Sequence, residues 1–151
     1  MKRNFLFALV LILFFFIGLS SFFSNDNKGL VQEVFTETNQ FRKSEGLAKL
    51  VIRKDLNVLA QKHSEDMASG RVGFGHDGFE ERNAVAQKEI KDMHSFAENV
   101  AYGATSGKEV ITMWESSPGH RRNMLGQYQY TGIGVAKDSQ GRIYYTEVFA
   151  D

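Results

Sequence analysis

The sequence predicts an α+β domain in which helices pack on a small, mostly antiparallel sheet. Beyond Ser24, the first half of the chain carries apolar residues at three-and-four spacing, which is typical of amphipathic helices. The C-terminal part instead holds two β-rich runs separated by a short polar loop, which favours a hairpin. Helices followed along the chain by strands indicate the α+β class, and no internal repeat is present.

The N-terminal residues 1–23 have the pattern of a secretory signal peptide or of a membrane anchor. A short basic start precedes a long apolar run, as in a signal sequence. Residues 5–23 would also span roughly 28 Å as a helix at ~1.5 Å per residue, close to the ~30 Å hydrocarbon core of a bilayer. Cleaved signal and retained anchor both remain open. Either one places the following domain outside the cytoplasm, secreted or held at the outer face of the membrane.

A short polar spacer at residues 24–29 leads into a domain that covers residues 30–151. The first helix is predicted over residues 30–44, where apolar side chains recur on one face. Asp55 can cap a second helix, and Gly70 ends it. These two helices are expected to present apolar faces to the core.

Two further helices are predicted in the middle of the chain. A short polar helix covers about residues 79–88, and Ser106-x-x-Glu109 has the pattern of a capping box at the start of an apolar helix. That apolar helix should end near Ser117, because Pro118 disfavours helical geometry at the residue before it.

The C-terminal hairpin is predicted from residues 130–136 and 142–149. Gly132 and Gly134 lack the third glycine and the following helix of a nucleotide-binding loop. Close packing of the strand backbone is therefore the better interpretation of these two glycines. Residues 96–102 are too short to be assigned to helix or strand from their pattern.

Composition excludes several classes of function. All 18 acidic residues but only 16 of the 18 basic ones lie beyond Ser24, which leaves a net charge of −2 on that part of the chain. A nucleic-acid partner is not expected, because phosphate binding needs clustered Lys and Arg. The chain has no cysteine, so disulfides, thiol catalysis and cysteine-bound metal are ruled out. The HExxH motif of zinc proteases and the G-x-S-x-G motif of serine hydrolases are also absent.

Four histidines and one glutamate are the candidates for chemistry. His63 lies on the apolar stripe of the second helix, where a satisfied core position is the better interpretation. His94 has polar neighbours and is expected to be exposed. His76 and His120 each follow a glycine in a connection predicted to be non-helical, and binding groups gather in such connections. Glu98 has mostly apolar sequence neighbours, and the candidate set is His76, Glu98 and His120.

Six stretches in order resemble the CAP (SCP) superfamily of cysteine-rich secretory proteins, antigen-five allergens and plant pathogenesis-related proteins, in its bacterial extracellular branch. They are TNQFRKSEGLAKL, LAQKHSEDMASGRVGFGH, AENVAYG, WESSPGHRRNML, YTGIGVA and YYTEVFA. The resemblance covers about residues 30–151. It implies a three-layer α-β-α sandwich.

The same resemblance implies a cavity lined by histidines and glutamates. The family histidines correspond to His76 and His120, which in some members hold a divalent metal such as Zn²⁺, and the first glutamate corresponds to Glu98. Ser117 stands where the second glutamate is usual, so the family's set of four is incomplete.

Three functions remain open at this point. The first is a non-catalytic extracellular binding module whose ligand is a lipid, a peptide or a cell-wall component. The second is a metal-dependent extracellular hydrolase, in which two imidazoles and a carboxylate would hold the metal. The third is a purely structural network of His76, Glu98 and His120 that holds loops to the sandwich.

Overall fold

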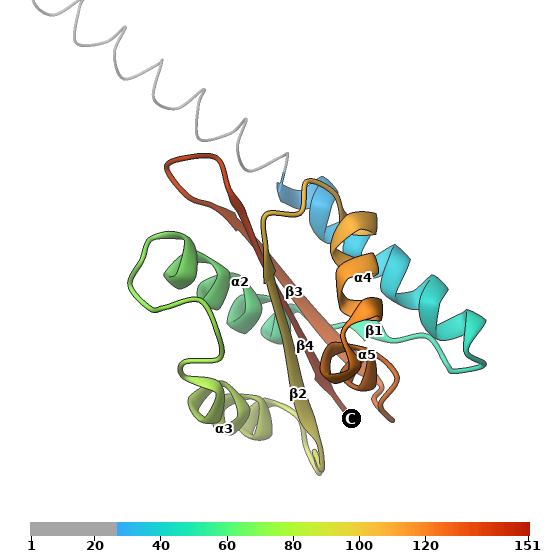
Figure 1. The fold of residues 1–151 in the computed structure, drawn as a ribbon. Helices are drawn as coiled ribbons and strands as arrows, with labels where there is room; N and C mark the ends of the chain where they lie inside the picture. Colours follow the sequence, from blue (N-terminus) through green and yellow to red (C-terminus); the bar gives the residue numbers. More distant parts are fainter. Residues whose placement is uncertain (1–26) are drawn as a thin grey trace, which may run out of the picture.

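The computed structural model describes residues 27–151 (Figure 1). The predicted signal peptide or anchor and the first residues of the predicted spacer lie outside this range. Within residues 27–151, no helix combines the length and the apolar character that crossing a membrane requires.

The sheet has four strands and is mostly antiparallel. Its spatial order is β1-β3-β4-β2, in which β4 pairs antiparallel with both of its neighbours and β1 pairs parallel with β3. The strands are β1 (Val51–Ile52), β2 (Phe96–Tyr102), β3 (Tyr130–Lys137) and β4 (Ile143–Ala150).

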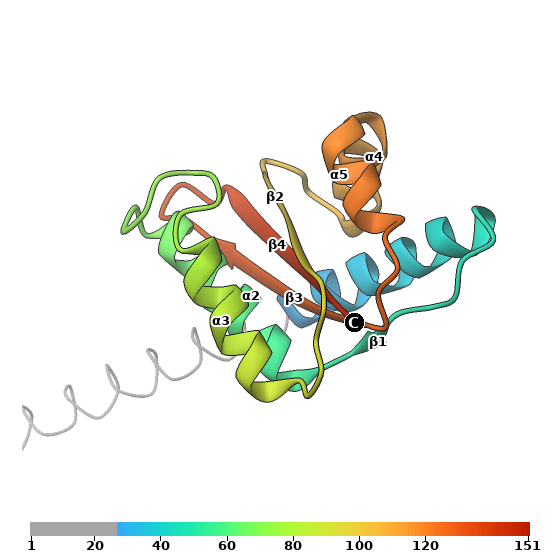
Figure 2. The same ribbon diagram turned by 90° about the horizontal axis from the view of Figure 1, so that it is seen from below.

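Helices cover both faces of this sheet and make three layers (Figure 2). One face carries the N-terminal helix (residues 27–44), α4 (Gly107–Ser116) and α5 (Pro118–Met124). The other face carries α2 (Lys54–Ala68) and α3 (Phe79–Glu89). The α+β class and the α-β-α layering are therefore confirmed.

Both of the first two predicted helices exist, with shifted starts. The N-terminal helix begins at residue 27 rather than 30, so residues 27–29 of the expected spacer are helical. In α2 the N-cap position is Arg53, and Asp55 lies in the first turn, where its carboxylate accepts the Leu56 N–H at 2.8 Å and two hydrogen bonds from Arg53. A carboxylate within the first turn still satisfies helix N–H groups, which explains the displaced cap.

The helix that the capping-box pattern predicted is α4. The Ser106 hydroxyl accepts the Glu109 N–H at 3.1 Å, as in a capping box, but the Glu109 carboxylate accepts from the backbone and hydroxyl of Thr105 instead of from the Ser106 N–H. The helix ends at Ser116, as Pro118 required.

The prediction of a non-helical connection at His120 is wrong. Pro118 opens α5, a further helix of 7 residues that contains His120. Proline is favoured at the first helical position because its missing N–H would be unbonded there and its φ is already helical. The same residue therefore ends one helix and begins the next.

Two strand assignments needed the tertiary structure. Residues 96–102 form β2, and its interior residues are all buried, so the alternation of polar and apolar residues that marks a half-exposed strand is missing. The parallel strand β1 has two residues, both exposed, which is too short for any periodic signal.

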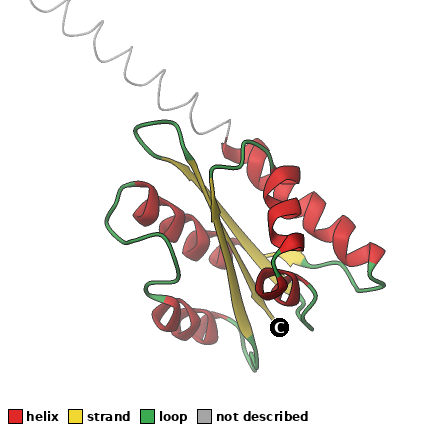
Figure 3. Cartoon of the chain, in the orientation of Figure 1, coloured by secondary structure: helices red, strands yellow, loops and turns green. Residues whose placement is uncertain are grey.

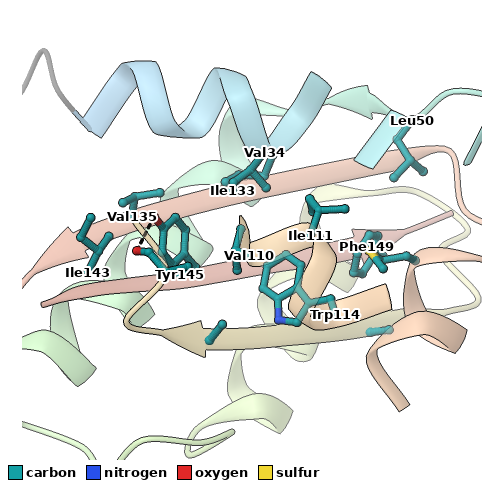
Figure 4. Close-up of a cluster of buried hydrophobic side chains, with 14 residues drawn as sticks. Val34, Leu50, Val110, Ile111, Trp114, Ile133, Val135, Ile143, Tyr145 and Phe149 are labelled. Carbon is teal, nitrogen blue, oxygen red and sulfur yellow. Dashed lines mark hydrogen bonds between the residues drawn. The ribbon is translucent and has the colours of Figure 1, made fainter. Parts of the chain in front are cut away.

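The core has two parts, one on each face of the sheet. The larger lies under the N-terminal helix and α4 (Figure 4). Its largest member is Trp114, which is buried and donates its indole N–H to the Val100 carbonyl at 3.2 Å. The smaller lies under α2 and α3 and includes Leu56, Ala60 and Val148.

The two glycines of β3 allow α2 to lie directly on the sheet. A Cβ at Gly132 would stand 2.2 Å from the carbonyl carbon of Leu56, and a Cβ at Gly134 would stand 2.2 Å from that of Ala60. Both contacts are with helix backbone, which cannot move aside. The predicted close packing at these glycines is confirmed.

Two ionisable side chains are buried where the N-terminal helix meets the rest of the domain: Arg42 on the helix itself and Glu147 on β4. Arg42 donates to four backbone carbonyls, at 3.0 Å to Ala48 and 2.7 Å to Met124, and also to Gly126 and Tyr128. The guanidinium thus ties the helix to the chain segment that follows α5.

Glu147 on β4 is the second of these buried side chains. Its two carboxyl oxygens accept hydrogen bonds from Thr38 at 2.9 Å and from Thr131 at 3.0 Å. Burial raises the pKa of Glu147 from 4.5 to about 8, against the opposing effects of these hydrogen bonds and of the Arg42 charge. The carboxyl group is consequently protonated in the folded protein at neutral pH.

Replacing Gly134 by Ala should destabilise the fold, because the new methyl group would overlap the α2 backbone. We expect the free energy of unfolding to fall by at least about 1–3 kcal/mol, the usual effect of overpacking. Urea unfolding of the full chain, followed by the fluorescence of its single tryptophan, measures this loss. Gly73→Ala is the matched control, since a Cβ there meets nothing within 4 Å. Equal stability of the two variants would contradict the packing argument.

Replacing Glu147 by Gln should remove a pH dependence of stability. The folded state keeps a proton on Glu147 up to about pH 8, whereas the unfolded state loses it near pH 4.5. The wild-type free energy of unfolding should therefore fall by a few kcal/mol as pH rises from about 4.5 to 8, at ~1.4 kcal/mol per pKa unit.

Glutamine cannot ionise, so the advantage of Glu147→Gln over wild type should grow across this pH range. Urea unfolding at several pH values measures it. The exposed Glu115→Gln serves as the control and should track wild type. If the free energies of unfolding of Glu147→Gln and wild type differed by the same amount at every pH between about 4.5 and 8, Glu147 would be ionised in the folded protein.

Candidate functional site

Glu98 lies at the centre of the candidate site. It projects from β2, and its side chain is 0% exposed. Arg82, on α3, forms a bidentate ion pair with this carboxylate. Its Nε lies 2.7 Å from Oε2 and its Nη2 lies 2.8 Å from Oε1. Such two-point pairing compensates the cost of burying the carboxylate.

His76 is the second partner of Glu98. Its Nδ1 lies 2.9 Å from Oε1 of the carboxylate, and its side chain is 50% exposed. Because an ionised carboxylate only accepts hydrogen bonds, Nδ1 carries the proton and Nε2 has the free lone pair when the ring is neutral. His76 is therefore held from one side and open to solvent on the other.

His63, on α2, completes the surroundings of Glu98. Its Nε2 is 2.8 Å from the Gly75 carbonyl and 3.9 Å from Oε1 of Glu98. Burial lowers the pKa of His63, so the folded state favours the neutral ring. As pH falls below about 6.5, the unfolded chain takes up a proton that the folded chain resists, and this histidine then destabilises the fold.

The loop 69–78, which carries His76, connects α2 to α3 (Figure 3). Two side chains attach the loop, since His63 bonds to Gly75 and Arg82 donates from Nη1 to the Asp77 carbonyl at 2.8 Å. Gly78 precedes α3 with φ at +76°, a conformation that favours glycine. His63 and Arg82, which lie beside Glu98, thus also attach the loop that carries His76.

His120 reaches the site from the other side of β2. The Asn99 side chain donates to the His120 carbonyl at 3.0 Å, and Asn123 donates to the Glu98 carbonyl at 3.1 Å and to the Asn99 side chain at 2.9 Å. These amides connect α5 to the strand that carries Glu98.

The imidazole of His120 packs beside Trp114, with ring centroids 6.4 Å apart. Burial, followed by the charge of His76, lowers the pKa of His120, so the two imidazoles are close enough to repel each other when protonated. No hydrogen bond or ion pair of the His120 ring is found within residues 27–151. No side chain or backbone group of the described range therefore pairs with its ring nitrogens.

Ser117 does not replace the missing second glutamate. It lies at the junction of α4 and α5, where its N–H bonds to the Trp114 carbonyl and its carbonyl accepts the Arg121 N–H. Its hydroxyl makes no capping hydrogen bond. The structure connects His76 with Glu98 and places His120 near them, but it assigns no side-chain contact to Ser117 in the described part of the chain.

The described side chains do not fit a zinc site with three protein ligands. No group of three or more His, Cys, Asp or Glu side chains within residues 27–151 is placed to hold a metal ion. Both oxygens of Glu98 are engaged by Arg82 and His76, which leaves two imidazoles as ligands. A catalytic zinc usually has three protein ligands and an open position.

Sequence reasoning missed Arg82, Asn99 and Asn123. Arg82 lies on a polar helix where a charged residue is ordinarily solvated, and it stands 16 positions before its partner Glu98. No helical or strand spacing links two such positions. Asn99 and Asn123 are nearer the candidates, since Asn99 follows Glu98 directly and Asn123 lies one helical turn after His120.

Sequence comparison matches the chain to a protein family and to bacterial relatives. A sequence model described as the cysteine-rich secretory protein family, CAP, matches residues 35–149. A Bacillus subtilis protein, named as the uncharacterized membrane protein YlbC, is 32% identical over 126 residues, which are 78% of this chain and 33% of YlbC.

Solved bacterial structures have the same fold. An extracellular protein with an SCP domain from Bacillus anthracis superimposes with a TM-score of 0.69 and 28% identity, over 82% of this chain and 40% of that one. A cysteine-rich secretory protein from Staphylococcus aureus gives 0.67 and 26%, over 82% and 38%. This chain therefore spans less than half the length of these relatives.

Replacing Arg82 by Met should strongly destabilise the fold, because it leaves the Glu98 carboxylate buried without its main partner. We expect the free energy of unfolding to fall by about 3–5 kcal/mol. Arg121→Met is the matched control, since Arg121 makes a single ion pair, with Glu45, in which both side chains are 38% exposed. Such surface pairs contribute less than about 1 kcal/mol. Similar losses in the two variants would contradict the central role of Arg82.

Proposed function

This chain belongs to the cysteine-rich secretory protein (CAP) family, and from that premise we propose that it is an extracellular binding module whose ligand contacts His76 and His120. One observation carries the proposal: the carboxylate of Glu98 is fully used in holding its neighbours, while the imidazoles around it keep free nitrogens. A carboxylate bound in this way positions other groups and is not available as a general base.

The two histidines would offer different hydrogen-bonding groups to a ligand. Nε2 of His76 accepts when the ring is neutral and donates when it is protonated. His120 is kept neutral by burial and by its neighbour His76, so it presents one donor and one acceptor. A ligand with both hydroxyl or amide donors and carbonyl acceptors suits this pair.

Three aromatic side chains contact one another in series, and the first of them, Phe74, is on the same loop as His76. Phe74 is 52% exposed and contacts Tyr102 edge to face at 4.7 Å between ring centroids, and Tyr102 stacks on Tyr144 at 5.7 Å. Exposed aromatic side chains in contact with one another mark binding surfaces for apolar or ring-shaped groups. A ligand with polar and apolar parts, such as a lipid, a peptide or a cell-wall component, fits this combination.

The N-terminal segment and the relatives support an extracellular location. Residues 5–23 would hold the domain at the outer face of the membrane if they are retained, and would direct its secretion if they are cleaved. The Bacillus subtilis relative is named a membrane protein and the Bacillus anthracis one an extracellular protein. Those proteins are longer, so their complete activities are not transferred to this chain.

A metal-dependent hydrolase is the second candidate, favoured by the proximity of the two imidazoles. It lacks a third protein ligand among the described residues, and Ser117 leaves no second carboxylate to act as a base. The binding module explains the same geometry without these groups.

Removing both imidazoles should remove a bound ligand. Native mass spectrometry of the full chain, extracted from its host membranes in detergent, should show a bound molecule in wild type and in His94→Ala. We expect its occupancy to fall at least tenfold in the His76→Ala/His120→Ala double variant. His94 is the control because it is exposed and lies outside the site.

Equal occupancy in all three proteins, or no bound molecule in any, would contradict the binding proposal. If the molecule lost from the double variant is Zn²⁺ alone, the result supports the metal-dependent candidate instead. Intact mass in the same spectra shows whether residues 1–23 are retained.

A further inference from the structure

A groove separate from the histidine site lies at the opposite edge of the sheet. It has a volume of about 840 Å³ and runs between the start of the N-terminal helix and α2, beside β3. Its lining includes Lys28, Lys54, Lys62 and Arg71 around an apolar floor of Val31, Val58 and Ile133. We call this the basic groove.

The basic groove is closed to an added peptide strand. Two side-chain amides of α2 already bond the outer edge of β3: Asn57 accepts the Ile133 N–H at 2.8 Å, and Gln61 accepts the Val135 N–H and donates to its carbonyl, both at 3.0 Å. An extended peptide would have to displace these bonds before it could pair with the strand. The groove therefore offers side chains, and not a strand edge, to its occupant.

The charge of the basic groove favours an anion. Lys62 and Arg71 share a single carboxylate, that of Asp66, so one positive charge of the two is uncompensated. Lys28 and Lys54 have no ion pair with any residue of the described range 27–151. Glu65 is the one acidic residue in the lining, which leaves a net positive charge there in a domain that is negative as a whole.

Apolar surface continues from the groove across the start of α2. Val58 is 60% exposed, and the neighbouring Val51 and Ile52 on β1 are 59% and 37% exposed. Three aliphatic side chains on the surface beside uncompensated lysines favour an amphiphile over a wholly polar anion such as a sugar-phosphate polymer.

The start of the N-terminal helix places the basic groove near the apolar segment. Asn27, the first described residue, lines the groove and stands four positions after Phe23. At no more than ~3.6 Å per residue, these positions are at most roughly 14 Å apart. If residues 5–23 anchor the chain in a bilayer, the groove is held within reach of the lipid headgroups.

We propose that the basic groove binds the headgroup of an anionic phospholipid in the membrane that anchors the chain. The phosphodiester pairs with Lys28 and Lys54, and the glycerol and upper acyl carbons contact Val31 and Val58. Basic side chains close to an anionic leaflet are attracted to its negative surface potential. The proposal rests on the proposed membrane anchor, and it orients the domain with α2 and β3 toward the lipid and with the histidine site away from it.

Cysteine labelling of the full chain in nanodiscs tests this proposal, because the natural sequence has no cysteine. Val58→Cys reports on the groove, and Val85→Cys on α3, 40% exposed in wild type, is the control. Reaction with a neutral, water-soluble maleimide is timed in phosphatidylcholine discs with and without phosphatidylglycerol. We expect phosphatidylglycerol to slow labelling at position 58 at least threefold and to leave position 85 unchanged.

Charge reversal by Lys28→Glu/Lys54→Glu should abolish the protection at position 58. Equal labelling rates in the two kinds of disc, or protection that survives charge reversal, would overturn the proposal. Protection in phosphatidylcholine discs by soluble glycerol phosphate alone would assign the groove to free phosphate esters. Protection there by purified teichoic acid but not by phosphatidylglycerol would assign it to a cell-wall polymer. Both results also overturn the lipid assignment.

The same experiment separates this proposal from the proposed function. His76→Ala/His120→Ala removes the proposed ligand site and should leave lipid protection at position 58 intact. A chain that fails to enter nanodiscs would contradict the anchor, and short-chain phosphatidylglycerol against short-chain phosphatidylcholine in solution then tests the groove directly. No difference between these two lipids would overturn it.

Discussion

The buried carboxylate of Glu98 is the interaction on which the arrangement of this domain's outer strand depends. A charge removed from water must be paired, and here Arg82 and His76 supply the partners while His63 lies 3.9 Å away. Those partners come from α2, from the following loop and from α3. One carboxylate therefore links three segments beside β2, two of which, α2 and α3, also pack in the smaller apolar core.

Further hydrogen bonds connect the surroundings of Glu98 to the helix that carries His120. Asn99 and Asn123 extend the network through the backbone of β2 to α5, which carries His120. The two histidines thus approach from opposite sides of one strand, His76 held by a hydrogen bond of its ring and His120 by one of its backbone carbonyl. Preorganisation of this kind reduces the entropy lost when a ligand binds.

The opposite edge of the sheet is organised by packing instead of by charge. Gly132 and Gly134 let the α2 backbone approach β3, and this closeness brings Asn57 and Gln61 within reach of the strand edge. The edge is thereby capped by side chains, which protects it from pairing with another chain. The two edges of the sheet are thus chemically distinct. Imidazoles from neighbouring segments lie beside β2, and lysines from neighbouring helices lie beside β3.

The sequence by itself determined the α+β class, most of the helices, the C-terminal hairpin and the close contact at the β3 glycines. Periodicity, capping residues and glycine act over a few positions, so a linear pattern records them. It also singled out Glu98 and His76, which contact each other, and His120, whose backbone is tied to the strand of Glu98. Only the tertiary structure decided that Pro118 opens the helix that contains His120, and that Arg82 is the counter-ion of Glu98. The pairing of a buried charge depends on which segments the fold brings together, and no local pattern of residues contains that information.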